Sequence, residues 1–173
     1  MKYLLSCFLN IFAFDENKLF LCRNTMFKID LVEGHHNSVV MKPIDSNEVD
    51  REIIINEMDR LKKLDAIEPS KSSWAFRVVI VNKKPDDEGV KKRLRVDFRP
   101  LNKITRPVIF PLPDIQTVLS SQANKAYFSL LDDNLGYHQF LIALEDRKTA
   151  FITQYTFMQY KRAPFGLYGM PGF

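Results

Sequence analysis

The chain has 173 residues, of which 46% are hydrophobic and 27% charged, and its formal net charge is +4 at pH 7. This length suffices for one ordinary domain with its own core, and the composition is typical of a globular chain rather than a disordered one. Two cysteines, Cys7 and Cys22, are too few for a disulfide framework, so we expect them to be reduced in an intracellular compartment.

The first 45 residues show no sustained hydrophobic period. The run from Tyr3 to Phe14 is apolar, but Asn10 interrupts it, no small-residue cleavage site follows, and a membrane span needs about 20 residues. We therefore interpret this run as a buried amphipathic helix and expect a chain that is neither secreted nor bound to a membrane. His35 and His36 lack further ligands at metal spacing, so no zinc site is expected there.

The pattern from Ser46 to about Asp65 predicts a helix that packs on a core. Asp45 or Ser46 can cap its start, and Asp59 lies four residues before Lys63, a favourable spacing for an ion pair. Pro69 and Ser70 are expected to end the helical segment. Four apolar side chains recur at helical spacing and are expected to face the core: Ile54, Met58, Leu61 and Leu64.

Two partly apolar segments, Trp74 to Asn82 and Lys91 to Phe98, predict a β-hairpin around the turn-forming residues 85–89. The stretch from Lys83 to Arg106 carries nine Lys and Arg against four Asp and Glu. A polyanion would bind where such positive charge gathers. Charge alone leaves two interpretations open, a polyanion-binding surface or a solvated face of the hairpin.

Beyond the hairpin, the sequence predicts one more helix and three strands. Pro113 is well placed to open a helix that runs to about Ser121, with Ile115, Val118 and Leu119 facing the core. The predicted strands are residues 127–131, 149–153 and 157–162.

The strand at 127–131 ends on two carboxylates, Asp132 and Asp133. An unpaired carboxylate next to a buried strand is costly, so a strand tip in water, a basic side chain or a divalent cation must stabilise Asp132. Successive strand side chains point to opposite faces, so only one of the two acids can face a given site. The alternative is that both acids simply begin a turn.

Leu131 and Asp132, followed by Gly136, Tyr137, His138 and Gln139, resemble the first catalytic motif of reverse transcriptases from gypsy-type LTR retrotransposons. Further blocks of that family occur in order: SSWAFRVVIVNKK from Ser72, LRVDFRPLNKIT from Leu94, FPLPDI from Phe110, KTAFIT from Lys148 and PFGL from Pro164. The resemblance extends from about Ile67 to Phe173. It implies an α+β fold, the fingers and partial palm of a right-hand polymerase, truncated before the Tyr-x-Asp-Asp hairpin. Residues 1–45 would be a linker-like region upstream and residues 46–173 an incomplete reverse transcriptase domain.

The resemblance also implies roles for individual residues. Asp132 would be the catalytic carboxylate. Asp132 and the backbone carbonyl of Asp133 would together bind one of two Mg²⁺ ions, for which Mn²⁺ is the alternative, and Asp133 would lie near the nucleotide. Lys83 and Arg93 would grip the nucleotide's phosphates. The Tyr137 ring would lie beneath the sugar and exclude a 2′ hydroxyl, while the family's counterparts of Phe165 and Gly166 floor the nucleotide pocket.

The implied function is that of a fragment of an RNA-directed DNA polymerase from a retrotransposon Pol polyprotein, inactive alone because the second aspartate motif is missing. Its partners would be an RNA or DNA template-primer, deoxynucleoside triphosphates, and the remaining palm, thumb, RNase H and integrase of the polyprotein. The implied location is the cytoplasm, in a virus-like particle, with nuclear access left open. Two alternatives remain: a non-catalytic RNA or RNA-DNA binding remnant that uses the basic hairpin, and a decayed product without function.

Overall fold

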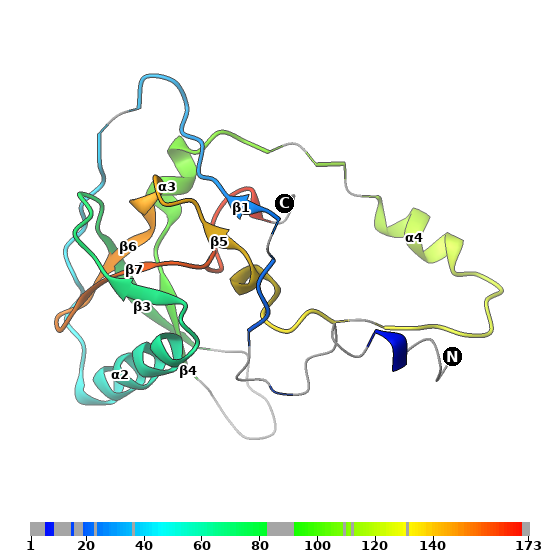
Figure 1. Ribbon diagram of the computed structural model, residues 1–173, viewed down its shortest axis with the longest axis horizontal. Coiled ribbons are helices and arrows are strands. Elements are labelled where there is room, and N and C mark those ends of the chain that lie inside the picture. The colour runs from blue at the N-terminus through cyan, green and yellow to red at the C-terminus, as the bar shows by residue number, and fades with distance from the viewer. Residues whose placement is uncertain are drawn as a thin grey trace.

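The computed structural model describes residues 6–8, 15, 19–22, 24–35, 37–82, 92–108, 110–111, 113–130 and 132–170. Their main feature is a five-stranded sheet in the order β2-β7-β6-β3-β4 (Figure 1), in which β3 and β6 pair in parallel and the other neighbours pair antiparallel. The strands are β2 (Ile67–Pro69), β3 (Phe76–Asn82), β4 (Lys92–Val96), β6 (Ala150–Ile152) and β7 (Phe157–Tyr160). A separate parallel pair joins β1 (Met26–Phe27) to β5 (Leu141–Ile142). The fold is thus a mixture of helices and strands, as predicted.

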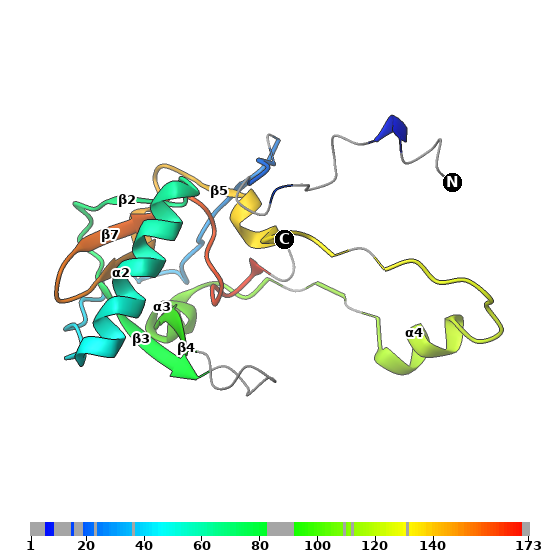
Figure 2. The same ribbon diagram turned by 90° about the horizontal axis from the view of Figure 1, so that it is seen from below.

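Helix α2 (Glu48–Lys63) lies beside the sheet and contacts β2 and β4 (Figure 2). The predicted apolar face is confirmed, because Ile54, Met58, Leu61 and Leu64 are all buried. The predicted pair of Asp59 with Lys63 is wrong, since Asp59 lies 3.8 Å from Lys62 instead. The helix also ends before Pro69, which belongs to β2.

The predicted cap of α2 is also wrong. The side chain of Asn47 accepts the Asp50 N–H at 2.8 Å and thereby caps the helix. Asp45 and Ser46 instead bond the side chain of Gln154, at 2.7 and 3.0 Å. These two residues therefore attach the turn between β6 and β7 to the start of the helix.

The β3–β4 hairpin is confirmed, in a register that runs from Val78 opposite Val96 to Asn82 opposite Lys92. Its base is buried, since Phe76 packs edge-on against Phe98 at a centroid distance of 5.3 Å. Side chains become exposed toward Asn82, so the hairpin leaves the core as it approaches its tip. The predicted turn at 85–89 lies outside the described residues. Strands β6 and β7 confirm the other two predicted segments near 149–162.

Two short helices follow the hairpin. Helix α3 (Arg99–Ile104), which the sequence patterns did not predict, buries Leu101 in the core. Helix α4 (Ile115–Ser121) is confirmed, with Asp114 as its cap. However, Ile115 and Leu119 are 73% and 57% exposed, so the predicted core-facing side is wrong.

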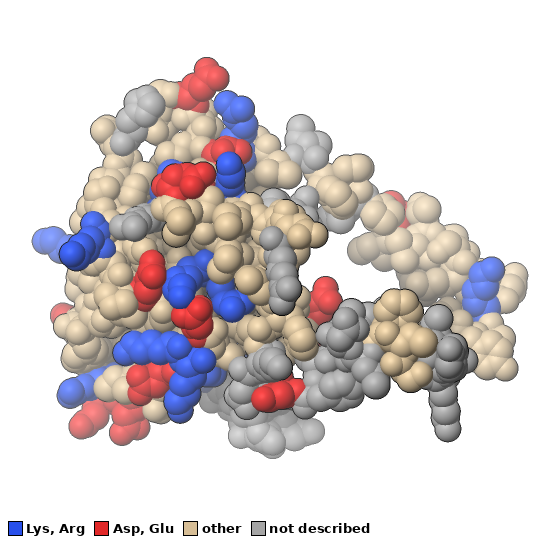
Figure 3. Space-filling view, viewed as in Figure 1, with Lys and Arg blue, Asp and Glu red and all other residues tan. Residues whose placement is uncertain are grey.

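Helix α4 belongs to residues 110–111 and 113–130, called the arm below. In both ribbon views the arm projects away from the body of the sheet, and Figure 3 shows it almost entirely in tan because few of its residues are charged. Helix α4 is too short and too distant from the sheet to bury its apolar side. The arm's large side chains are consequently exposed.

The predicted strand at 127–131 is not formed in the described residues 127–130. Tyr127 and Leu130 are 94% and 95% exposed, and this segment pairs with no strand of the described chain. A strand needs a neighbour for its backbone hydrogen bonds, and alternating apolar residues cannot replace one. Leu131 lies outside the described residues.

At the N-terminal end, most of the predicted helix at 3–14 lies outside the described residues. Cys7 and Cys22 are both free thiols, in agreement with the expectation that they do not form a disulfide. Among the described residues, none of the helices has the length and apolar character needed to cross a membrane.

The contrast between the core and the arm gives a direct prediction. Phe76→Ala should lower the free energy of unfolding by about 3–5 kcal/mol, because Phe76 is fully buried between Trp74 and Phe98. Phe128→Ala, on the exposed arm, should change it by less than about 0.5 kcal/mol. Urea denaturation of both variants measures the difference, and equal losses would contradict this arrangement of core and arm.

Candidate functional site

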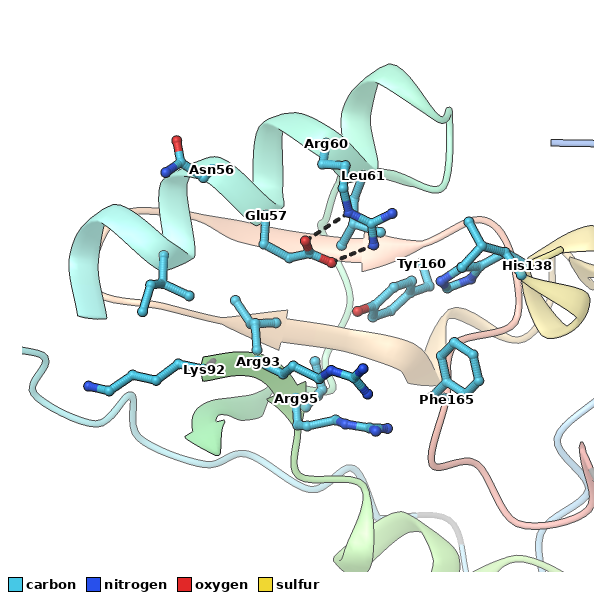
Figure 4. Close-up of a pocket in the computed structure, with 14 residues that line it drawn as sticks. Asn56, Glu57, Arg60, Leu61, Lys92, Arg93, Arg95, His138, Tyr160 and Phe165 are labelled. Atoms are coloured by element: carbon cyan, nitrogen blue, oxygen red, sulfur yellow. Dashed lines mark hydrogen bonds and ion pairs between the residues drawn. The ribbon is translucent and has the colours of Figure 1, made fainter. Parts of the chain in front are cut away.

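A cavity of about 680 Å³ lies between α2 and β4 and is called the α2–β4 cavity below. Three parts of the chain line it: Ile53, Asn56, Glu57, Arg60 and Leu61 of α2; residues 92–96 of β4; and Leu135, His138, Tyr160 and Phe165. Figure 4 shows the helix on one side, the basic strand on the other, and Tyr160, His138 and Phe165 at one end. The cavity is therefore built from segments that are far apart in the sequence.

Basic side chains dominate the polar lining, and Glu57 is the only acid among the described residues that line it. Glu57 binds the Arg60 guanidinium through two hydrogen bonds of 2.7 and 2.8 Å. Lys92 is paired with Asp50 at 2.7 Å. Arg93, one of the predicted phosphate-binding residues, lines the cavity and is exposed. The cavity is consequently suited to an anion.

The end of β4 is fixed by the buried carboxylate of Asp97. The carboxylate accepts hydrogen bonds of 2.7 and 2.8 Å from the Arg99 guanidinium. The backbone N–H of Asp97 donates to the Arg77 carbonyl. The hydrogen bonds from Arg99 lower the pKa of Asp97 to about 2. The carboxylate therefore stays ionised at neutral pH and holds the strand that carries Arg93.

Tyr137 and Phe165, two predicted nucleotide-binding residues, lie in contact. Their ring centroids are 5.0 Å apart at an interplanar angle of 57°. The His138 ring packs edge-on against the same Phe165 ring, with the two ring centroids 5.7 Å apart. Phe165 thus lines the same cavity as Arg93, and Tyr137 contacts the Phe165 ring without lining the cavity itself.

A tight turn places Tyr137 and His138 in this position. Both belong to a 3₁₀ helix, η2 (Gly136–Gln139), which Leu135 precedes with a left-handed φ of +48°. A Cβ at Gly136 would lie 3.2 Å from the Asp133 Cβ, so the turn leaves little room for a side chain there. A side chain at position 136 would require Asp133 to shift by a few tenths of an ångström.

The turn that carries Phe165 is held by a side chain that the sequence patterns did not single out. Asn102 of α3 donates to the Gly166 carbonyl at 2.8 Å and accepts the Tyr168 N–H at 2.9 Å. Gly166 has a φ of +95°, a backbone conformation that favours glycine. The predicted residue Gly166 therefore lies in a turn fixed from both sides by one amide. Because Asn102 is more than 60 residues away from its partners, no local pattern could have revealed it.

His138 is also a site residue that the motif contained but that received no role from the sequence. Its ring is buried and stacks on Tyr160 at an interplanar angle of 13°. Nδ1 lies 3.0 Å from the Ala163 carbonyl, which can only accept, so Nδ1 carries the proton. Burial lowers the pKa of His138, as do the charges of Arg60 and Arg162, although the Ala163 hydrogen bond and Glu57 act in the opposite direction.

The two predicted metal ligands are not part of the cavity. Asp132 and Asp133 are both exposed and lie between the arm and η2. Within the described residues, no group of three or more His, Cys, Asp or Glu side chains could hold a metal ion. Two exposed carboxylates have the oxygen chemistry that Mg²⁺ requires, but they do not form a preset site. Lys83, the other predicted phosphate ligand, lies outside the described residues.

The burial of His138 predicts a pH dependence of stability. In the unfolded chain this histidine titrates near pH 6.5, whereas the fold keeps it neutral to lower pH. Below about pH 6.5 the unfolded chain therefore binds a proton that the folded chain does not, and stability should fall as the pH drops toward the folded pKa. Urea denaturation between about pH 7.5 and 5.5 should show this slope.

His138→Gln should flatten that slope. His35→Gln is the matched control, because His35 is exposed, and it should leave the slope unchanged. A slope that is equally steep in His138→Gln would show that another group causes it.

The Asn102 contacts predict a local effect on the Phe165–Gly166 turn. Asn102→Ala should speed hydrogen exchange of the Tyr168 amide and cost about 1 kcal/mol of stability, since both bonds are lost. Asn102→Asp keeps the acceptor for Tyr168 and should protect that amide more than alanine does. Asn37→Ala, at an exposed position, serves as the control. Unchanged exchange at Tyr168 in Asn102→Ala would contradict the assigned contact.

Comparison with known proteins found curated relatives and solved structures, whereas no protein-family model matches the chain. The Retrovirus-related Pol polyprotein from transposon opus of Drosophila melanogaster is 40% identical over 126 residues, which cover 72% of this chain and 12% of that protein. The corresponding protein from transposon gypsy is 37% identical over 119 residues, or 67% of this chain and 12% of its own length. The Pol polyprotein from transposon 297 is 30% identical over 173 residues, which cover 99% of this chain and 16% of that protein. The chain thus spans less than a fifth of these relatives.

Among solved structures, a prototype foamy virus protease-reverse transcriptase mutant superposes with a TM-score of 0.76 and 22% identity, over 99% of this chain and 22% of that one. The foamy viral protease-reverse transcriptase in complex with an RNA/DNA hybrid gives a TM-score of 0.73 and 17% identity, over 98% of this chain and 22% of that chain. At these identities the likeness shows a shared fold.

Proposed function

Because this chain is homologous to the reverse transcriptase region of the gypsy, opus and 412 retrotransposon Pol polyproteins, we propose that it forms the fingers and first part of the palm of an RNA-directed DNA polymerase. Its own contribution is to hold the incoming deoxynucleoside triphosphate and the template-primer. The rest of the polyprotein, namely the remaining palm, thumb, RNase H and integrase, would complete the enzyme. The proposed location is a cytoplasmic virus-like particle.

One observation carries this proposal: Arg93 and Phe165 both line the α2–β4 cavity and Tyr137 contacts the Phe165 ring, although the three residues come from separate segments. A guanidinium can bind phosphate oxygens through two parallel hydrogen bonds. The Tyr137 and Phe165 rings offer an apolar surface for a sugar, and Gly166 beside Phe165 carries no side chain that could obstruct it. Lys83 would add a second positive charge for the phosphates.

The proposed catalytic residue is Asp132. In the intact polymerase, Asp132 and the backbone carbonyl of Asp133 would help to hold Mg²⁺ or Mn²⁺, which activates the primer hydroxyl and stabilises the leaving group when bound. Asp132 is exposed and therefore accessible to such an ion and to a primer end. One carboxylate and one carbonyl are too few ligands for tight binding, so this chain alone should not polymerise DNA.

A second candidate is an RNA or RNA-DNA binding remnant without catalysis. The observation that favours it is that Asp132 and Asp133 lie outside the cavity and that the described residues contain no cluster of metal ligands. Arg93 and its neighbours on β4 would then bind nucleic-acid phosphates.

Binding of an RNA-DNA hybrid, followed by fluorescence anisotropy, tests both candidates. If β4 contacts two phosphates, raising the salt concentration from roughly 50 to 200 mM should weaken hybrid binding about tenfold. Arg93→Gln should reduce the affinity several-fold and lower the salt slope by about one. Lys125→Gln, which removes an exposed positive charge from the arm, is the control and should have little effect.

Primer extension with the same proteins tests the expected inactivity of the chain alone. Templated extension that Asp132→Ala abolishes would support an enzyme and refute both that inactivity and the remnant. Hybrid binding that survives Asp132→Asn without any extension would agree with both candidates. Salt-independent binding, or none, would refute both.

A further inference from the structure

We propose that Arg95 is a second phosphate-binding residue of the α2–β4 cavity, acting with Arg93 on a nucleoside triphosphate, and that the face of Phe165 holds its guanidinium in place. This inference rests on the proposed function, which assigns the phosphates to Arg93. It adds a residue that neither the motifs nor the charge pattern singled out.

The geometry of β4 brings the two arginines together. Residues two apart on a strand point to the same face, so Arg93 and Arg95 leave β4 in the same direction. Both line the cavity. In Figure 4 their side chains extend side by side toward the end of the cavity that Tyr160 and Phe165 close. An anion there would meet two guanidiniums rather than one.

The surrounding charges leave these two arginines available. Arg60 is neutralised by Glu57, and Lys92 by Asp50. Neither Arg93 nor Arg95 forms an ion pair with a carboxylate of the described residues. Glu57, the one acid of the described lining, is already bound. A phosphate that enters the cavity therefore competes with no protein carboxylate for Arg93 or Arg95.

Phe165 distinguishes Arg95 from an ordinary exposed arginine. The Arg95 Cζ lies 5.7 Å from the centroid of the Phe165 ring, within the range of a cation–π contact. Tyr137 and His138 pack against the same ring and restrict its motion. A guanidinium over an aromatic face keeps its N–H donors free at its own edge, where a phosphate can accept them. The ring thus orders Arg95 before a ligand arrives.

The proposal is tested on the full 173-residue chain by calorimetric titration with dTTP and with inorganic tripolyphosphate, both in EDTA so that no metal contributes. Arg95→Gln should weaken binding of both ligands by about tenfold, similar to Arg93→Gln, because each removes a charge-assisted pair of hydrogen bonds. Arg95→Lys should weaken it by about threefold, since it keeps the charge but loses the planar fork. Lys125→Gln is the matched control for charge and should leave the affinity unchanged.

A double-mutant cycle tests the role of Phe165. Phe165→Leu keeps an apolar side chain but removes the aromatic face, and it should weaken tripolyphosphate binding by about threefold in the wild-type background. In the Arg95→Gln background the same substitution should have no further effect on tripolyphosphate, because this ligand has no sugar to contact the ring. Equal effects in both backgrounds would refute the positioning role of Phe165.

Three outcomes of the titrations would overturn the assignment of Arg95. If Arg93→Gln weakens binding and Arg95→Gln does not, the inference about Arg95 is wrong and the proposed function stands. If neither substitution matters, the proposed function fails as well. If Lys125→Gln weakens binding as much as Arg95→Gln, the effect is one of net charge and Arg95 is not a specific ligand. Thermal melting checks that the variants are folded. If Arg95→Gln does not fold, the affinity of Arg95→Lys decides whether Arg95 binds phosphate.

Discussion

The buried guanidinium of Arg162 connects the parts of the molecule that form the candidate site. It donates to the backbone carbonyls of Asp65, Phe20 and His138, at 3.3, 3.4 and 3.1 Å. Burying a charge is costly unless its hydrogen bonds are satisfied, and here carbonyl oxygens satisfy them. One side chain therefore joins the end of α2, the N-terminal segment and η2. It acts together with the Ala163 hydrogen bond and the Tyr160 stack, which hold the His138 ring beside Phe165.

The α2–β4 cavity shows the same principle on a larger scale. Its basic wall is a strand at the edge of the sheet, its opposite wall is a helix, and its end is formed by side chains of η2 and of the segment after β7. Different residues hold each wall: Asp97 for β4, the apolar face of α2, and His138 with the half-buried Asn102 for the aromatic end. The exposed residues of the lining are thus supported by residues that are buried or half-buried, two of which, Leu61 and His138, also line the cavity.

Much of the fold was predictable because it depends on local patterns. The period of Ile54, Met58 and Leu61 predicted α2, and apolar strands around a charged turn predicted the β3–β4 hairpin. The motif that contains Tyr137 and the block that contains Phe165 predicted two residues that the structure brings into contact.

The remainder depends on contacts that no local pattern contains. Residues 127–130 have the alternation of a strand but no neighbour in the described chain with which to pair. Asn47 rather than Ser46 caps α2 because Ser46 bonds Gln154, more than a hundred residues away. Asn102 and Arg95 act on the turn and ring near Phe165 across similar distances in sequence.

The order of strands in the sheet has a consequence for synthesis on the ribosome. Strands β2 and β3 are consecutive in the chain, yet β7 and β6 lie between them. Strand β2 and the edge of β3 that faces β6 therefore lack their partners until residue 160 has left the ribosome. At about 5–20 residues per second, the 64 residues between the ends of β4 and β7 delay closure of the sheet by roughly 3–13 seconds. During that interval the edges of β2 and β3 are unpaired, and the nascent chain is a substrate for chaperones that bind incompletely folded chains.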